Sequence, residues 1–505
     1  MEFFFIILVS LSLCFLLKLL IFPSNPTKNL PPGPSKISLF SNFIFGRKSF
    51  SELGPIISSL RKKYGPLITI NLGSQPTIYI TNNSLAHKAL VQNGAVFADR
   101  PQSINNLIVS NSKKIISKSS YGPVWRALRR NLTAGVLHPS QLRAFSTIRK
   151  RVLDNLINGL EKESNGGNKT VFVEEYFRHA IFSLLILLCF GENVDENQIK
   201  EVEVAQLKLF KNFHRFKLFI FFPRIGKFVF KKVWTELTGI VTGYDDVIRP
   251  LIQARTKEIS ENSTKDDECT NFYVDTLLNL QVPGEEGNIT ENDIVGLCNE
   301  FVSAGTDTTM IALLWIMANV VKYPEIQEKI LEDIKNAIGD EKKSISEEDL
   351  NKMPYVKAVV LEGLRRHPPG YAPATPHAVI EDVEFGGYSI PKGTAINFLI
   401  ADIGRDPKIW ENPMEFQPER FMKSDDVRSF DVTGNREIKM MPFGAGRRVC
   451  PGYGLAMLHM EYLVANLVRN FQWSKVDGEE VDLTEKFDLT ISMKNPLGVR
   501  LFPRV

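Results

Sequence analysis

The sequence predicts a mainly α-helical fold with small β-sheets, arranged as a single globular domain behind an N-terminal transmembrane helix. Three observations lead to this prediction. Most segments of the 505-residue chain show the hydrophobic period of helices, and few segments alternate like strands. No linker, repeat or low-complexity tract divides the chain after about residue 37. The first 22 residues, in contrast, are almost entirely apolar.

Charge and cysteine content exclude several classes of protein. The chain carries 61 Lys and Arg against 57 Asp and Glu, a net charge of +4, which lacks the strong basic excess of nucleic-acid-binding domains. We therefore expect no nucleic-acid partner. Five cysteines are too few, and odd in number, for a disulfide framework. A domain that faces the cytosol is the simplest reading of that content.

The N-terminal segment predicts a signal-anchor helix over residues 1–22. Residues 3–22 are apolar apart from Lys18, and about 20 such residues cross the hydrocarbon core of a bilayer. A cleaved signal peptide is the alternative, but the region before the apolar run holds only Glu2, and no small-residue cleavage site precedes Pro23. Lys28 and Lys36 follow the apolar run and no basic residue precedes it, which places the rest of the chain in the cytosol.

A proline-rich hinge then connects the anchor to the globular domain. Residues 23–36 contain Leu30-Pro31-Pro32-Gly33-Pro34, a stretch that cannot form a helix and has little freedom in φ. We therefore predict a stiff spacer over residues 23–36 and one domain over residues 37–505.

The strand signals fall in two places. Leu67–Leu72 and Thr77–Thr81 flank Gly73-Ser74-Gln75-Pro76 and predict a hairpin. A second cluster comprises Val383–Ile390 and Ala395–Leu399, separated by Pro391-Lys392-Gly393. Two polar stretches, 165–169 and 261–270, predict surface loops.

One predicted helix is long enough to run through the whole domain. Thr290 to Asp293 resemble a capping box, and apolar positions continue until Pro324 ends the helix. Its middle reads Ala304-Gly305-Thr306-Asp307-Thr308-Thr309, and we expect Thr308 to bond back to the Ala304 carbonyl and bend the helix. Small residues there also permit close helix packing, but an acid and an alcohol beside them favour a functional role.

Cys450 differs from the other four cysteines. Cys14, Cys189 and Cys298 lie in apolar segments and Cys269 in a polar loop, whereas Cys450 follows a glycine-rich loop and precedes a helix predicted over Gly452–Phe471. A helix N-terminus favours a thiolate. The loop is not a dinucleotide fingerprint, because no strand leads into it, nor a zinc site, because no second Cys or His stands at ligand spacing.

The motif around Cys450 and several motifs elsewhere in the chain resemble those of a known family. The pattern F-x-x-G-x-R-x-C-x-G resembles the haem-binding loop of cytochromes P450 and is filled by Phe443, Gly446, Arg448, Cys450 and Gly452. Further landmarks follow along nearly the whole chain: Ala304–Thr309 resembles the oxygen-activating helix, Glu362 to Arg365 the E-x-x-R pair, Pro418–Phe421 its partner, and Trp125 to Arg129 the W-x-x-x-R of the helix over the haem propionates. The proline-rich hinge is typical of microsomal members, and Ser84–Pro101 resembles the plant family numbered eighty-nine.

The resemblance implies a role for each of these residues. Cys450 would ligate the iron of haem b as a thiolate. Arg129, Arg448 and His377 would hold the two propionates, with Trp125 as a further donor; many relatives carry Arg in place of His377, so it ranks below the arginines.

It also implies roles for the long helix and for the E-x-x-R pair. Asp307 and Thr308 would relay protons to dioxygen, and Ala304 and Gly305 would leave room for it. Glu362 and Arg365 are spaced to pair, and with Arg420 they read as a buried network that serves folding and haem retention.

The sequence says less about which residues bind the substrate. By family position, Gly370–Pro376 and Leu489–Met493 line the pocket together with the long helix. The mostly apolar content predicts a small lipophilic substrate, with these candidate pocket residues: Ala304, Tyr371, Ala372, Ala374, Ile491 and Met493. Residues 206–235 are dense in Phe and basic residues, which suits a single-stranded nucleic-acid surface, a membrane-dipping access channel or an ordinary core face; the anchor favours the channel.

The sequence thus predicts a membrane-anchored haem-thiolate monooxygenase that oxidises, by hydroxylation, a lipophilic plant metabolite with O2. Since the chain has no nucleotide motif, electrons would come from NADPH through a separate cytochrome P450 reductase, docked at Arg126, Arg130 and Arg447. The expected location is the endoplasmic reticulum membrane, single-pass, with the catalytic domain facing the cytosol. The alternatives are a haem-binding sensor or carrier without turnover, and a nonfunctional anchored scaffold.

Overall fold

The computed structural model describes residues 29–34, 52–72, 75–101, 112, 114–216, 219, 226–262, 271–284, 287–339, 345–373, 375–423, 427–488 and 490–504. The predicted anchor at residues 1–22 lies outside the described residues, and so do most of the hinge at 23–36 and most of the predicted loop at 261–270. The loop predicted at 165–169 is present, and Asn165 adopts a positive φ of 47° there.

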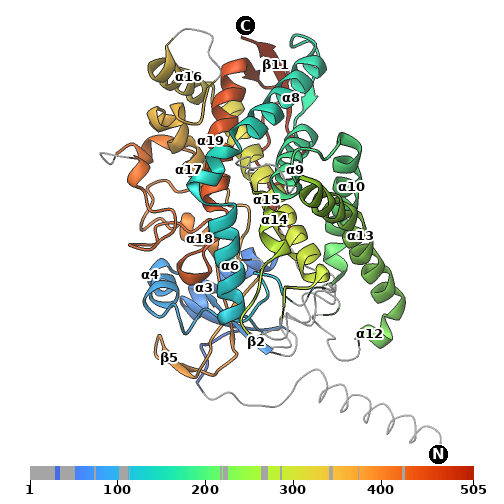
Figure 1. The fold of residues 1–505 in the computed structure, drawn as a ribbon. Helices are drawn as coiled ribbons and strands as arrows, with labels where there is room; N and C mark the ends of the chain where they lie inside the picture. Colours follow the sequence, from blue (N-terminus) through green and yellow to red (C-terminus); the bar gives the residue numbers. More distant parts are fainter. Residues whose placement is uncertain are drawn as a thin grey trace, which may run out of the picture.

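Helices make up most of the described molecule (Figure 1), as the hydrophobic periodicity predicts. They are α3 (Leu53–Tyr64), α4 (Asn83–His87), α6 (Pro123–Gly135), α7 (Pro139–Ala144), α8 (Ser146–Ser164), α9 (Glu174–Phe190), α10 (Glu196–Phe213), α12 (Gly226–Val229), α13 (Lys231–Asn262), α14 (Tyr273–Leu278), α15 (Glu291–Lys322), α16 (Pro324–Ile338), α17 (Pro354–Arg366), α18 (Ile400–Gly404) and α19 (Tyr453–Asn470).

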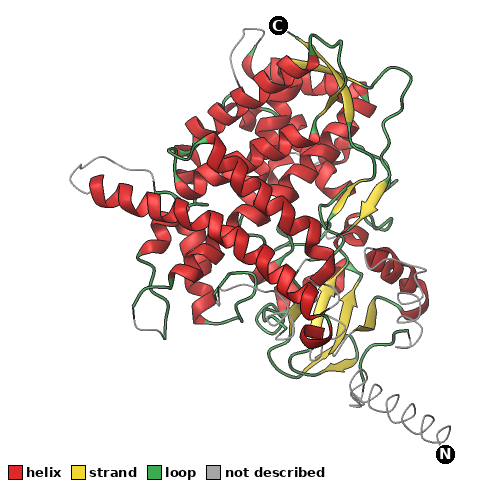
Figure 2. Ribbon diagram, turned by 90° about the vertical axis from the view of Figure 1, so that its right-hand side faces the viewer, coloured by secondary structure: helices red, strands yellow, loops and turns green. Residues whose placement is uncertain are grey.

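The strands are short and lie at the edges of the helical body (Figure 2). They are β1 (Leu67–Leu72), β2 (Gln75–Ile80), β3 (Val171–Phe172), β4 (His377–Ala378), β5 (Val383–Phe385), β6 (Tyr388–Ile390), β7 (Ala395–Phe398), β8 (Phe471–Ser474), β9 (Glu485–Phe487), β10 (Ile491–Met493) and β11 (Gly498–Pro503).

The long central helix begins and ends where the sequence predicts. The Thr290 hydroxyl accepts the N–H of Asp293, and α15 ends at Lys322, just before Pro324. In Figure 1 α15 runs through the middle of the body, where it packs along α9 and also contacts α13, α17 and α19. Among the described residues, α15 is the one helix long and apolar enough to span a membrane, but its burial marks it as a core helix.

The first predicted hairpin is confirmed and the second strand cluster is arranged differently. β1 pairs antiparallel with β2 from Leu67↔Ile80 to Leu72↔Gln75. The segment Val383–Ile390 folds back on itself as the hairpin β5–β6, because Gly386 and Gly387 adopt positive φ values of 62° and 84°. β7 instead joins the first hairpin, parallel to β2, in the order β1-β2-β7-β4.

The aromatic and basic segment at 206–235 forms part of the core. Phe219 is buried against Leu237 and Ile240 of α13, and Phe216 and Trp234 pack on the same cluster. Phe221 and Phe222 lie outside the described residues. For Phe216, Phe219 and Trp234 the contacts favour an ordinary core face, whereas Phe228 in the same segment is 83% exposed.

Candidate functional site

The glycine-rich loop before α19 gives Cys450 a fixed backbone position. The Cys450 N–H donates to the Phe443 carbonyl at 2.8 Å, and Val449 N–H donates to Gly446 at 3.1 Å. Gly446 has a φ of 70°, and a Cβ placed on it would lie 1.9 Å from the Leu90 carbonyl oxygen, so only glycine fits there. The loop can therefore lie directly against the turn at Lys88–Gln92.

Burial raises the pKa of the Cys450 thiol, while the Gly452 N–H and the Arg129 charge act in the opposite direction. The Gly452 N–H at the start of α19 thus acts in the direction that the sequence predicts, and burial opposes it. A metal cation deprotonates a coordinating thiol outright. A bound cation would therefore hold Cys450 as a thiolate.

Two donors on α6 lack a hydrogen-bond partner among the described residues. Trp125 and Arg129 are four residues apart and share a face of the helix. The buried indole Nε1 of Trp125 has no hydrogen-bond partner in the part of the chain that the structure describes. No ion pair or side-chain hydrogen bond of Arg129 occurs within the same residues, and burial lowers its pKa, opposed by the charge of Cys450. Both groups are available to an acidic ligand beside the thiol.

Arg448 also binds the protein backbone. Its guanidinium donates to three backbone carbonyls, those of Ala98 and Ser119 at 2.7 Å and that of Ile116 at 3.2 Å. Burial and the neighbouring Arg100 lower its pKa to about 9. These three bonds hold the surrounding backbone in place, and the guanidinium lies 4.4 Å over the Trp125 ring.

Arg100 belongs to the same cluster and was not singled out by its sequence pattern. It donates to the carbonyls of Ser117, Thr375 and Pro376 at 2.8, 3.0 and 2.9 Å. Burial lowers its pKa to about 10. The only sequence signal was its place in the Ser84–Pro101 stretch.

His377 is present at this cluster as a neutral ring. Burial, together with the charges of Arg100 and Arg448, lowers its pKa to about 3. Its Nδ1 lies 2.8 Å from the Phe97 carbonyl and therefore carries the proton. His377 can offer a ligand no positive charge at neutral pH, which agrees with its lower rank among the candidates.

The middle of α15 presents two different faces. Ala304 and Thr308 are exposed although the helix around them is buried, and the Thr308 hydroxyl donates to the Ala304 carbonyl at 2.7 Å, as predicted. Thr306 makes the matching bond to Val302 at 2.7 Å but is fully buried. Ala304 and Thr308 therefore form the open face of this helix.

The Asp307 side chain and the backbone at Gly305 face α9 instead. The Asp307 carboxylate pairs with Arg178 of α9, which also binds Glu174 at 3.1 Å. Burial raises the Asp307 pKa, and the Arg178 charge opposes that rise. A Cβ on Gly305 would lie 2.8 Å from Leu185, so this glycine permits close packing of α15 on α9, and the expected role in leaving room for oxygen gains no support.

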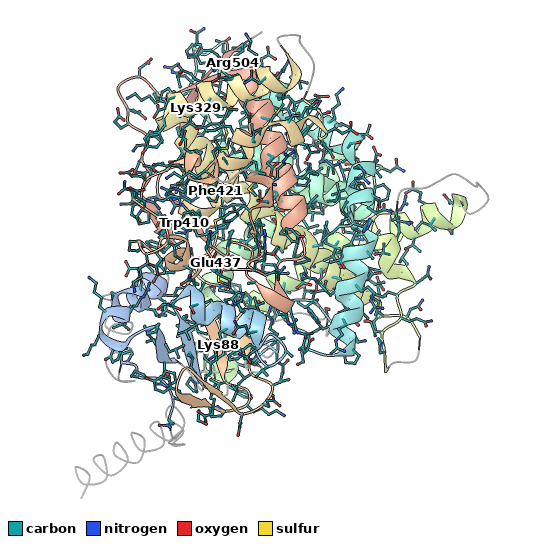
Figure 3. The ribbon with its side chains drawn as sticks, turned by 90° about the vertical axis from the view of Figure 1, so that its left-hand side faces the viewer. Lys88, Lys329, Trp410, Phe421, Glu437 and Arg504 are labelled. Carbon is teal, nitrogen blue, oxygen red and sulfur yellow. The ribbon has the colours of Figure 1, made fainter. Side chains whose placement is uncertain are left out.

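The Glu362 network has the pairing that its spacing predicts. Arg365 binds both carboxylate oxygens of Glu362, at 2.6 and 2.8 Å, and Arg420 binds Glu362 at 3.1 Å. The side chains of Glu362 and Arg365 are fully buried. Arg365 also lies 5.3 Å from the ring of Trp410, which packs against Phe421 (Figure 3).

Some candidate pocket residues lie close together. Tyr371 packs with Ala372 against α3 and β1, and its hydroxyl donates to Asp402 at 2.7 Å. The Tyr371 ring also lies 5.8 Å from that of Phe487, which pairs with Ile491; its place in the pocket stays a prediction. Ile491 is buried, Met493 is half-buried and Ala374 lies outside the described residues.

These residues fit a haem. The donors of Trp125 and Arg129 suit acidic groups on a ligand, and the adjacent, partly exposed thiol suits an iron ion. The exposed face of α15 presents an alcohol at Thr308 and a small side chain at Ala304. No group of three or more His, Cys, Asp or Glu that could hold a metal by themselves occurs among the described residues.

Comparison with known proteins gives a consistent result. The family model described as Cytochrome P450 matches residues 31–501. The chain is 44% identical to cytochrome P450 89A9 of Arabidopsis thaliana over 99% of this chain and 98% of that protein. It is 29% identical to isoflavone 2'-hydroxylase of Medicago truncatula over 96% of this chain and 94% of that protein.

A solved structure shares the fold. A zebrafish cytochrome P450 determined with progesterone superposes with a TM-score of 0.74 at 24% identity, covering 90% of this chain and 99% of the other. The mainly helical fold with small sheets, and the resemblance to the plant family numbered eighty-nine, are thereby confirmed.

Proposed function

The chain belongs to the cytochrome P450 family of haem-thiolate monooxygenases, and we propose that it hydroxylates a small lipophilic plant metabolite at the site between Cys450 and the open face of α15. The observation that carries the proposal is the coincidence of the Cys450 thiol with the unpaired Trp125 and Arg129 donors. The plant hydroxylase among the relatives supports the type of oxidation.

Each residue of the site has a proposed task. Cys450 ligates the iron, Trp125 and Arg129 bind the propionates of haem b, with His377 as a neutral neighbour, and Arg448 holds the surrounding walls through backbone carbonyls. When bound, the haem supplies the oxidising chemistry, since a thiolate ligand favours cleavage of an O–O bond. Phe443, Gly446 and Gly452 shape the loop that carries the thiol.

Proton delivery is assigned to the middle of α15. The Thr308 hydroxyl lies on the open face and can exchange its bond to Ala304 for one to water or oxygen there. Asp307 is the source of protons, but its carboxylate is bound to Arg178 and reaches Thr308 only through water. Ala304 provides space because its side chain is a single methyl group.

Membrane attachment and electron supply complete the proposal. Residues 1–22 anchor the chain in the endoplasmic reticulum membrane, residues 23–36 form the hinge, and residues 37–505 are the catalytic domain in the cytosol. Phe228 and Val229 of α12 are 83% and 65% exposed, which suits contact with lipid.

Electrons come from NADPH through a cytochrome P450 reductase. Arg126 and Arg447 lie 5.1 and 5.5 Å from the Tyr121 ring, and Arg130 is exposed on the same helix as Arg126. The three arginines give an acidic partner a positive surface on which to dock.

The first experiment is a spectral-shift screen of lipophilic plant metabolites, followed by turnover of each hit with NADPH and the reductase. We expect at least one compound to give a hydroxylated product. A protein that binds haem and such compounds but forms no product under these conditions would instead be the sensor or carrier.

A pair of threonine variants separates these two functions. Thr308→Ala removes the hydroxyl on the open face and should release peroxide, because electrons are then consumed without product. Thr306→Ala removes the same kind of bond at a buried position and should leave the ratio of product to NADPH unchanged. Equal ratios in both variants would contradict the assigned role of Thr308.

A further inference from the structure

The hairpin β9–β10 is held in place by side chains. Among the described residues β9 and β10 pair only with each other, from Ile491↔Phe487 to Met493↔Glu485. A two-stranded hairpin has little stability of its own. Its position against the helices must therefore come from the contacts of individual residues.

The first contact is made by Glu485 on β9. Its carboxylate binds Arg405, Arg366 at 3.2 Å and His367 Nδ1 at 3.1 Å. Burial opposes its ionisation, but the hydrogen bond from His367 and the charge of Arg405 outweigh burial and lower the Glu485 pKa to about 2. Glu485 is thus a carboxylate at every physiological pH.

The second contact is made by Trp315 of α15 on β10. Its indole Nε1 donates to the Ile491 carbonyl at 2.8 Å, and the Ile491 N–H donates to Pro369 at 2.7 Å. Trp315 is fully buried. Both backbone groups of Ile491 are therefore fixed.

A stacked pair of rings joins the two contacts. The rings of Trp315 and His367 lie parallel, with 2° between their planes and 4.0 Å between their centroids. Burial lowers the His367 pKa to about 3, so the ring is neutral and its Nδ1–H donates a hydrogen bond to the Glu485 carboxylate. Glu485, His367, Trp315 and Ile491 thus form one connected unit, the hairpin clamp, which holds both strands.

The hairpin clamp lies on the same side of α15 as the open face. Trp315 follows Thr308 by seven residues, which is two turns, or about 10 Å, along one side of a helix. That side is exposed at Ala304 and Thr308 and fully buried at Trp315. Ile311 and Ala312, one turn after Thr308, are also buried. The hairpin clamp therefore lies on the side of the open face, about one turn beyond the point where that face ends.

We propose that Glu485 and Trp315 are positioning residues that set how closely the β9–β10 hairpin approaches the open face of α15, and so which substrates fit there. This inference rests on the proposed haem-thiolate function. Neither residue touches the substrate; they act through the hairpin. Loss of either contact lets the hairpin move and changes the space available to a bulky ligand more than to a small one.

The test compares two nitrogen ligands, imidazole and 4-phenylimidazole, by difference-spectrum titration of the full-length haem-loaded protein. Glu485→Gln removes the charge at the centre of the contact, and Trp315→Phe removes the N–H donor while it keeps an aromatic ring on His367. Each should change the ratio of the two dissociation constants by about fivefold, the factor that corresponds to one net hydrogen bond. Imidazole affinity by itself should stay the same.

Asp275→Asn is the matched control. Asp275 pairs with Arg255 through two bonds of 2.9 Å and is similarly buried, but it lies on α14. This variant should keep the wild-type ratio. If Glu485→Gln fails to fold, Trp315→Phe alone decides.

Two negative results are distinguishable. An unchanged ratio in Trp315→Phe, with a normal wild-type spectrum, would overturn the role of the hairpin clamp. A wild-type protein that gives no spectral shift with imidazole would overturn the haem-thiolate proposal itself.

Discussion

Two buried polar regions of this molecule differ in whether their groups have partners. Around Glu362, the carboxylate is bound by two arginines, and Arg365 also donates to the carbonyls of Gly404, Pro413 and Glu415. Around Cys450, the Trp125 indole has no partner in the described chain and burial raises the thiol pKa. The groups of the first region are paired with each other, whereas the second region holds a donor without a partner among the described residues.

The difference shows how burial of polar groups separates stability from function. A buried polar group without a partner costs about 1–3 kcal/mol. Other buried polar atoms of the described chain, such as His459 Nε2, also lack a partner, but the Trp125 donor lies on the helix face that also carries Arg129. A network in which every group is paired costs most when one member is removed. We therefore expect substitutions in the first region to affect folding and those in the second to affect haem binding.

The largest effect is expected at Glu362. Glu362→Gln leaves Arg365 and Arg420 with an uncompensated charge in the interior and should lower the free energy of unfolding by about 3–5 kcal/mol. Urea denaturation measures this. The control is Glu419→Gln, which breaks the half-exposed pair with Lys329 at 2.6 Å and should cost less than about 1 kcal/mol. Equal losses in the two variants would remove the distinction between network and surface pair.

The next effect is expected at Trp125. Trp125→Phe removes the unpaired donor and should weaken haem binding by about tenfold or more, because bonds to charged groups are worth about 1.5–3 kcal/mol. Haem transfer to apomyoglobin measures the affinity. Trp473→Phe is the control, since its indole already donates to Leu467 at 2.9 Å. The Trp473→Phe variant should be less stable and should keep the wild-type haem affinity. Haem affinity that falls in Trp473→Phe but not in Trp125→Phe would contradict the assignment.

A smaller effect is expected on the pH dependence of stability, to which three histidines contribute. Burial lowers the pKa values of His367, His377 and His459 to about 3. Below about pH 6.5 the unfolded chain binds protons that the folded chain excludes, so stability present above that pH is lost as pH falls toward 3. His459→Leu should reduce the slope of stability against pH by one proton, about 1.4 kcal/mol per pH unit, between pH 6 and 4.

His459 lies in neither of the two polar regions compared above. The difference between His459→Leu and the wild type therefore reports on stability and not on the haem site. Urea denaturation at pH 8, 6, 5 and 4 gives the slope. The two proteins should differ least in slope at pH 8. A slope that is the same in the variant and the wild type throughout this range would show that His459 is already protonated in the fold.

The smallest effect is expected on the outer surface. Arg126→Glu and Arg130→Glu reverse two exposed charges and should slow electron transfer from the reductase severalfold at low salt, with the difference disappearing at high salt. Lys162→Glu on α8 is the matched reversal elsewhere and should have no effect. A rate and salt dependence unchanged in the arginine variants would reject this docking surface.

Features encoded by neighbouring residues were predictable from sequence. The cap at Thr290, the end at Pro324, the bond from Thr308 to Ala304 and the Glu362–Arg365 pair all follow from spacings of four residues or fewer, or from proline. The family motif then identified Cys450 within its loop.

Features that join distant segments were not predictable. Arg178 with Asp307, and Glu485 with His367, connect residues more than a hundred positions apart, and local spacing carries no information about them. The same holds for contacts that the predicted roles did not include. Arg448 donates to carbonyls of residues 98–119, and Tyr371 packs against α3; whether the two residues also contact the haem or the substrate stays a prediction.

The most direct test of the central claim is the carbon monoxide difference spectrum of the reduced full-length protein, measured for the wild type and for Cys450→Ser. The account predicts a band at the thiolate-specific wavelength in the wild type and its loss in the variant, because Cys450 is the iron ligand. A wild-type protein without that band, or a Cys450→Ser variant that retains it, would contradict the account.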